Sequence, residues 1–148
     1  LREELDFVKR YVDVEKQLVG DDFEFAINIA ESVNIDQVRI PSMFVQILVE
    51  NAFVHGLKGW DGHKIIHIGI SKEGKNTCIK VRDNGPGFDI RSVGKKRTGL
   101  NVITQTIVIV NERNKNKMNF SLNNEQENGK VVGCVATIVI PDNIKLFI

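Results

Sequence analysis

The sequence predicts an α/β protein, in detail a two-layer α+β sandwich whose mixed sheet is covered on one face by helices. Two observations support this fold class. Apolar residues recur with a helical period in three segments, and they alternate with polar residues in several short segments bounded by turn residues. The predicted order is helix, strand, helix, hairpin, glycine-rich segment, helix, hairpin, which is typical of helices packed on a sheet.

The N-terminal part is predicted to contain two helices and a strand. Residues 1–19 form a helix with one apolar stripe, which four further apolar residues widen: Leu1, Leu5, Val8, Val12 and Val19, then Phe7, Tyr11, Val14 and Leu18. The alternating segment Phe23–Ile29 is a strand. A short extended piece at 38–40 leads into a second helix, which Pro41 begins and Gly56 ends.

Two hairpins and a third helix are predicted in the rest of the chain. The first hairpin joins strands at 64–70 and 77–82 through a polar turn at 71–76. Residues 84–97 are glycine-rich and then basic, as in a mobile lid, and a helix follows near 100–111. The second hairpin joins strands near 118–122 and 131–140 through a polar turn at 123–130.

Composition excludes several classes of protein. The chain has 148 residues, 42% of them hydrophobic and 26% charged, which suits one soluble domain with a sizeable core. A formal net charge of +1 gives no broad basic surface for nucleic acid. Cys78 and Cys134 both lie in predicted strands, which favours a reduced, cytosolic protein. The chain begins at Leu1 inside a helix, so we expect an excerpt of a larger protein.

The second helix carries two polar residues within its apolar face. At 100° per residue, Asn51 and His55 fall within about 60° of Phe44 and Leu48. A buried amide without a partner costs roughly 1–3 kcal/mol, so this face should hold something polar. Asn51 is either a core asparagine bonded to backbone or a Mg²⁺ ligand. His55 accordingly either lies near the helix C-terminus, where it interacts favourably with the helix dipole, or reaches a phosphate or orders the pocket wall.

The strand ending at Asp83 leads into a loop with two glycines. Ile79, Val81 and Asp83 share one strand face, so the carboxylate lies at the mouth of a core, where it can accept a hydrogen bond from an amino group such as that of adenine. Gly85 and Gly87 permit positive φ and a close backbone approach. The alternative is a plain surface turn, since these dipeptides are common in turns.

Three motifs together resemble the GHKL ATPase superfamily. The segment Glu50-Asn51-Ala52-x-x-His55-Gly56 is similar to the N box, 83–88 to the G1 box, and 97–100 to the G2 box. The chain most resembles the catalytic ATP-binding domain of LytS/YehU-type sensor histidine kinases. In that group the N box reads Ile-Pro-x-x-x-x-Gln-x-Leu-Val-Glu-Asn-Ala, which residues 40–52 match.

The resemblance implies a Bergerat fold that binds ATP and Mg²⁺ between its helices and a lid. Asn51 would be the Mg²⁺ ligand, and Asp83 would bind the adenine amino group. His55 would contact phosphate, and Glu50 would be either an acid/base helper or a rim salt bridge. The remaining nucleotide-binding residues would lie at the two ends of the lid: Gly85, Gly87 and Phe88 at its start, and Thr98, Gly99 and Leu100 where it meets the third helix.

The family also implies a reaction and partners. The domain would transfer the ATP γ-phosphoryl group to a histidine on a separate dimerisation segment, and a response regulator would then accept it. The parent would be a homodimer anchored in the bacterial inner membrane, with this domain in the cytoplasm. Hydrolysing relatives carry a glutamate one turn before the asparagine, whereas this chain has Ile47, which favours transfer. The alternatives are a serine kinase or anti-sigma-type module and a degenerate signalling scaffold.

Several positions depart from the family pattern. Val54 stands where many relatives have lysine, so one phosphate contact is missing. Arg97 replaces the first glycine of the G2 box, and it either supplies positive charge or impairs lid closure. Cys134 stands where relatives often have threonine. These departures bear on catalytic competence more than on nucleotide binding.

Overall fold

The computed structural model describes residues 1–20, 22–57, 60–88 and 98–146. Its centre is a five-stranded mixed sheet in the order β1-β2-β3-β5-β4. Only the β1–β2 pair is parallel among these strands, which agrees with the predicted mixed sheet. The strand bounds are β1 Phe23–Ile29, β2 Lys64–Glu73, β3 Asn76–Asp83, β4 Asn119–Glu127 and β5 Lys130–Pro141.

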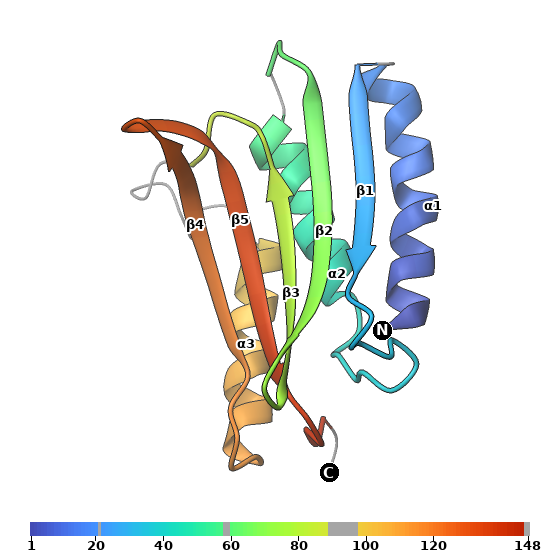
Figure 1. Cartoon of the computed structure of the whole chain (residues 1–148), viewed down its shortest axis with the longest axis vertical. Helices are drawn as coiled ribbons and strands as arrows, with labels where there is room; N and C mark the ends of the chain where they lie inside the picture. Colours follow the sequence, from blue (N-terminus) through green and yellow to red (C-terminus); the bar gives the residue numbers. More distant parts are fainter. Residues whose placement is uncertain (21, 58–59, 89–97, 147–148) are drawn as a thin grey trace.

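Three helices pack with this sheet. They are α1 Arg2–Val19, α2 Phe44–Asn51, which continues as the π-helix η1 Ala52–Leu57, and α3 Thr98–Glu112. Figure 1 shows α2 and α3 behind the sheet and α1 beside the edge strand β1. The three helices and the strands contribute to one hydrophobic core, so the prediction of a helix-covered sheet is confirmed.

The two faces of the sheet differ in polarity because strand residues alternate. Ile66, Ile68 and Ile79 are fully buried on the face that the helices cover. Lys80 and Arg82 alternate with them along β3 and reach the opposite, solvated face, where Arg82 lies near Glu125 of β4. This alternation places Asp83 on the helix-covered side at the end of β3.

Three predicted elements differ from those observed. The second helix begins at Phe44 rather than Pro41 because Met43 adopts a left-handed conformation, with φ 73°. The last hairpin is longer than predicted, since 123–127 belongs to β4. Its turn is the pair Asn128-Gly129, whose φ values of 53° and 79° suit a two-residue type I′ turn. The first hairpin likewise extends to Glu73.

The N-terminus of α2 is capped by a residue from another helix. The Met43 N–H donates to Oε2 of Glu4 at 3.1 Å, and the Val45 N–H donates to Oε1 at 3.3 Å. The first N–H groups of a helix have no partner within it, and a negative charge there is favourable. Glu4 of α1 therefore both satisfies these donors and joins α1 to α2.

We expect Glu4→Ala to lower the free energy of unfolding by ~1–2 kcal/mol, as the loss of a helix cap does. Glu3→Ala is the matched control, because Glu3 shares the first turn of α1 but is exposed. Urea unfolding of the two variants measures the difference. Equal losses would show that the acidic first turn of α1, and not the cap on α2, accounts for the effect.

Candidate functional site

The Asp83 carboxylate lies against the π-helix η1. Asp83 is only 9% exposed, and its register partners across the sheet are Ile66 and Cys134. A Cβ atom placed on Gly56 would lie 2.5 Å from Oδ2 of Asp83, which is closer than real contacts allow. The carboxylate thus occupies the space that a side chain at Gly56 would need. The two segments singled out from the sequence are therefore neighbours in space.

The turn after Asp83 also packs on η1. The Gly85 N–H donates to Oδ1 of Asp83 at 2.9 Å, which fixes one carboxylate oxygen. A Cβ atom on Gly85 would lie 1.8 Å from the carbonyl oxygen of Gly56, so the two backbones touch directly. Gly85 therefore admits no side chain, and a side chain at Gly56 would have to displace the Asp83 carboxylate.

Asn124 of β4 holds the chain after the second glycine. The Phe88 N–H donates to Oδ1 of Asn124, the Nδ2 of Asn124 donates to the Phe88 carbonyl, and both distances are 2.9 Å. Gly87 has φ 84°, and a Cβ atom there would lie 2.7 Å from Oδ1 of Asn124. Sequence reasoning missed Asn124 because it assigned 123–130 to a turn. Its pairing with Cys134, the partner of Asp83, puts it in the same cross-strand row.

The start of α3 approaches α2 one turn before Asn51. A Cβ atom on Gly99 would lie 2.9 Å from Cγ2 of Ile47, so the missing side chain permits this approach. Leu100 is buried in the core at 7% exposure. Thr98 begins α3. The basic residues expected in the lid, Lys95 to Arg97, lie outside the described residues.

Asn51 is the last residue of α2 and lies between these two contacts. It follows Ile47 by one turn, about 6 Å along the axis, and precedes η1, whose Gly56 contacts Asp83. The residue is half-buried, and within the described residues no hydrogen bond to its side chain is found. Within the part of the chain that the structure describes, no side chain or backbone group competes with a ligand for this amide.

The π-helical turn after Asn51 was not predicted. π-Helical turns are rare overall, but many of those that occur lie at functional sites. The wider turn changes the α-helical period on which the His55 prediction rested: His55 is exposed, whereas Phe44 and Leu48 are buried. His55 therefore lies at the surface of η1 rather than on the buried stripe.

Glu50 is exposed and lies toward α1. Burial raises the pKa of Tyr11 to about 12, and the nearby carboxylates of Glu15 and Glu50 contribute in the same direction. The Tyr11 ring in turn meets Phe53 of η1 edge-on, with centroids 5.9 Å apart. Glu50 therefore sits near the junction of α1 and η1.

Sequence similarity relates the chain that carries this site to known proteins. No protein-family model matches the chain. The chain is 37% identical over 89 residues to the sensor histidine kinase YpdA of Escherichia coli K12, a match that covers 60% of this chain and 15% of YpdA. It is 31% identical over 103 residues to the sensor histidine kinase YesM of Bacillus subtilis 168, covering 68% of this chain and 18% of YesM. The homologues of this chain are sensor histidine kinases. They include LytS of Streptococcus agalactiae, 30% identical over 95 residues, 64% of this chain and 16% of LytS.

Solved histidine kinases share the fold. The catalytic domain of the histidine kinase ThkA superposes with a TM-score of 0.66 at 17% identity, covering 96% of this chain and 93% of that one. The mycobacterial sensor histidine kinase MprB gives a TM-score of 0.62 at 14% identity, with 97% and 95% covered. The fold is therefore that of histidine kinase catalytic domains, as the sequence predicted.

This chain corresponds to only part of the sensor kinases named above. It spans between 15% and 18% of the length of YpdA, YesM and LytS. None of the helices in the described ranges combines the length and apolar character needed to cross a membrane.

Proposed function

We propose that this chain is the ATP-binding catalytic domain of a two-component sensor histidine kinase, which transfers the γ-phosphoryl group of ATP to a histidine on a separate segment. One observation carries the proposal. The segments that contain Gly85 and Gly99 both pack on the continuous helix formed by α2 and η1. Asp83 and Gly85 lie against Gly56, and Gly99 lies against Ile47. Asn51, whose amide is unpartnered within the described residues, lies between them.

The adenine end of the proposed site is at Asp83. Its carboxylate is nearly buried, and the Gly85 N–H engages one of its oxygens. Such a group recognises an amino donor, and the exocyclic amine of adenine is one. The glycines at 56 and 85 bring the two backbones close to the carboxylate, which sets its position for an incoming base. The Asn124 amide would set the position of the lid's first residues through Phe88.

The phosphate end is at Asn51 and the start of α3. A neutral amide oxygen suits Mg²⁺, which keeps several waters when it bridges phosphates, and the unpartnered amide of Asn51 fits that role. Bound Mg²⁺ would supply neutralisation of the phosphate charge. The backbone N–H groups of Thr98, Gly99 and Leu100 open a 15-residue helix, and helix N-termini favour anions. His55 would reach a phosphate from η1.

Transfer to a protein is favoured over hydrolysis. The position one turn before Asn51 holds Ile47, whose methyl group contacts Gly99, so no side chain there can activate a water. Glu50 is left as the nearby carboxylate for proton transfer, and it lies at an exposed rim where a protein acceptor can approach. Two of the relatives are named as sensor histidine kinases and a third as a sensor protein, which favours this function over a serine kinase or a scaffold.

The proposed partners follow from the function. The acceptor is a histidine segment of the same parent protein, which is a membrane-anchored homodimer with this domain in the cytoplasm. A response regulator then receives the phosphoryl group. The structure of ThkA in complex with the response regulator protein TrrA, which matches this chain with a TM-score of 0.65 at 14% identity, supports such a partner.

Asp83→Asn tests the proposal. We expect it to weaken ATP binding by ~1.5–3 kcal/mol, roughly 10- to 100-fold in Kd, because the amide cannot replace a charged acceptor. The preference for ATP over GTP should narrow. Glu73→Gln, on an exposed residue of β2, is the control that removes one carboxylate elsewhere on the sheet. Calorimetry with Mg-ATP and Mg-GTP measures both effects, and unchanged selectivity would contradict the adenine role.

A further inference from the structure

The helix α1 carries a second apolar stripe that its own domain leaves open. Phe7, Val14 and Leu18 are 48%, 62% and 77% exposed, and Tyr11 between them is half-buried. Spacings of four, three and four residues bring these side chains onto one line along the helix. Exposed apolar residues scattered singly are normal, but a continuous line of them marks an interaction surface.

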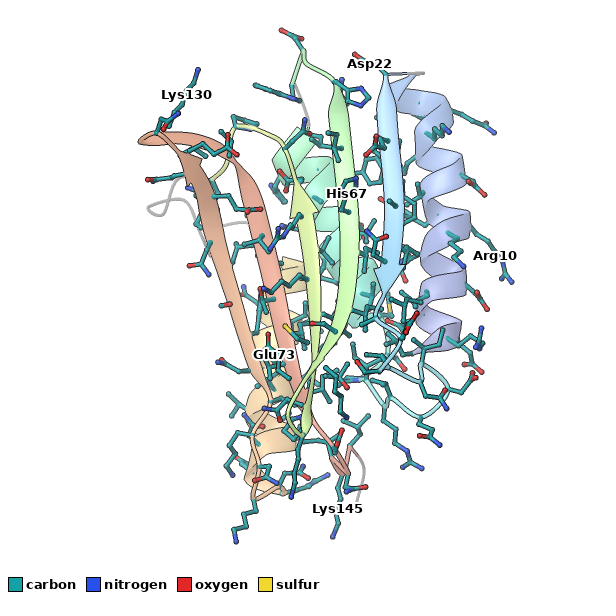
Figure 2. All side chains as sticks on the ribbon, viewed as in Figure 1. Arg10, Asp22, His67, Glu73, Lys130 and Lys145 are labelled. Carbon is teal, nitrogen blue, oxygen red and sulfur yellow. The ribbon has the colours of Figure 1, made fainter. Side chains whose placement is uncertain are left out.

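This stripe is distinct from the one that anchors α1. The anchoring stripe consists of Leu5, Val8 and Val12, which are almost completely buried in the core. Figure 1 shows α1 at the edge of the molecule, beside β1, and in Figure 2 Arg10 extends away from the rest of the molecule. One face of α1 therefore holds the domain together, while another is available to a second helix.

The spacing of the open stripe is that of a coiled coil. In the heptad notation abcdefg, Tyr11 and Leu18 occupy a positions and Phe7 and Val14 occupy d positions. Arg10 then falls at g and Glu15 at the following e. In a parallel pair of identical helices, a g residue of one chain faces the next e residue of the other, so Arg10 and Glu15 would pair twice. In an antiparallel pair they would not meet.

The charges around the stripe suit such a pairing. Within the described residues, neither Arg10 nor Glu15 takes part in an ion pair. Glu15 and Glu50 both lie near Tyr11, so the side of the stripe toward the domain body is acidic. The opposite side carries Glu3, Arg10 and Gln17 at the g positions. Two copies related by a twofold axis along α1 would bring Arg10 of each against Glu15 of the other.

We propose that α1 is a dimerisation helix, which pairs in parallel with α1 of a second copy of this chain through Phe7, Tyr11, Val14 and Leu18. Arg10 of each copy contacts Glu15 of the other. This pairing does not depend on the proposed kinase function, because it uses none of the residues assigned to nucleotide binding.

The pairing is weak in the isolated chain. A helix of 18 residues is about 27 Å long and offers just over two heptads, which buries less area than a typical stable dimer. Copies that another segment already holds together would pair through α1 far more completely, because the second contact becomes intramolecular.

Sedimentation equilibrium from micromolar to millimolar concentration tests the dimer. We expect reversible dimers, and we expect Val14→Lys to abolish them without changing the melting temperature, because Val14 is exposed. Arg10→Glu should weaken the dimer at least roughly tenfold, and the double variant with Glu15→Arg should restore it. Val108→Lys, on an exposed valine of α3, is the matched control and should leave the dimer intact.

The variant Leu18→Cys tests the parallel register. It should form an intermolecular disulfide under mild oxidation, because the two a positions meet in a parallel pair. The native Cys78 and Cys134 are buried, so they do not compete. A chain that stays monomeric throughout would overturn the proposal and assign the stripe to a different polypeptide. A dimer that neither forms this disulfide nor responds to the charge exchange would overturn it as well.

Discussion

Replacing Asn51 with alanine should abolish Mg-dependent ATP binding and leave the fold intact. The amide is the side-chain oxygen that the proposed site offers to Mg²⁺, and a carbon side chain cannot replace it. The fold should survive because, within the described residues, no group depends on this amide for a hydrogen bond. We expect no detectable heat of Mg-ATP binding by calorimetry, with a melting temperature within about 2 °C of the wild type.

Asn28→Ala provides the matched control for that experiment. Asn28 is an exposed asparagine of β1, so Asn28→Ala removes the same amide group at a position outside α2. This variant should bind Mg-ATP as the wild type does. Retained Mg-dependent affinity in Asn51→Ala would refute the metal assignment, and ATP binding that was independent of Mg²⁺ in the wild type would do so too.

Replacing Gly85 with alanine should disrupt both stability and nucleotide binding. The new methyl group would lie 1.8 Å from the Gly56 carbonyl oxygen, and both partners belong to the backbone, so neither can rotate away. Separating them would move the Asp83 carboxylate from η1 and break its hydrogen bond with the Gly85 N–H. We expect a loss of about 3 kcal/mol in the free energy of unfolding, as severe overpacking causes.

Gly69→Ala is the control for a glycine that nothing crowds. A Cβ atom there meets no atom within 4 Å, and it sits in the strand β2. Alanine is the better residue in a strand interior, so stability should change by less than about 1 kcal/mol and in the favourable direction. Chemical unfolding measures the stability of both variants, and calorimetry measures their affinity for ATP. Similar behaviour of the two would show that the contact between Gly56 and Gly85 is not what organises the site.

The sequence predicted most of the strands, and the closeness of two of its motifs, because their signals are local. Alternation at 23–29 and the apolar run before Asp83 gave β1 and β3 nearly to the residue. The motifs that contain Gly56 and Asp83 were expected to face one another, and the structure places these two residues side by side. The assignments of Asn51 to Mg²⁺ and of Glu50 to proton transfer stay predictions, since they concern ligands rather than folding.

The features that were missed depend on distant partners. The strand at 123–127 is polar and resembles a turn, and backbone pairing with β5 overrides that weak propensity. Without that strand, the hold of Asn124 on Phe88 could not be foreseen. The π-helical turn at η1 cannot be recognised from an apolar pattern that is analysed with the α-helical period. The cap on α2 comes from Glu4, 39 residues before Met43 in the chain.

The Glu4 carboxylate also has a mechanical consequence. It belongs to α1, while the two amides that it binds belong to the start of α2, at the opposite end of that helix from Asn51. Because a helix is stiff along its axis, a displacement of the first turn of α1 would pass to α2 through these two hydrogen bonds. The same two hydrogen bonds would transmit a displacement in the opposite direction, from a nucleotide bound near η1 to the outer surface of the protein.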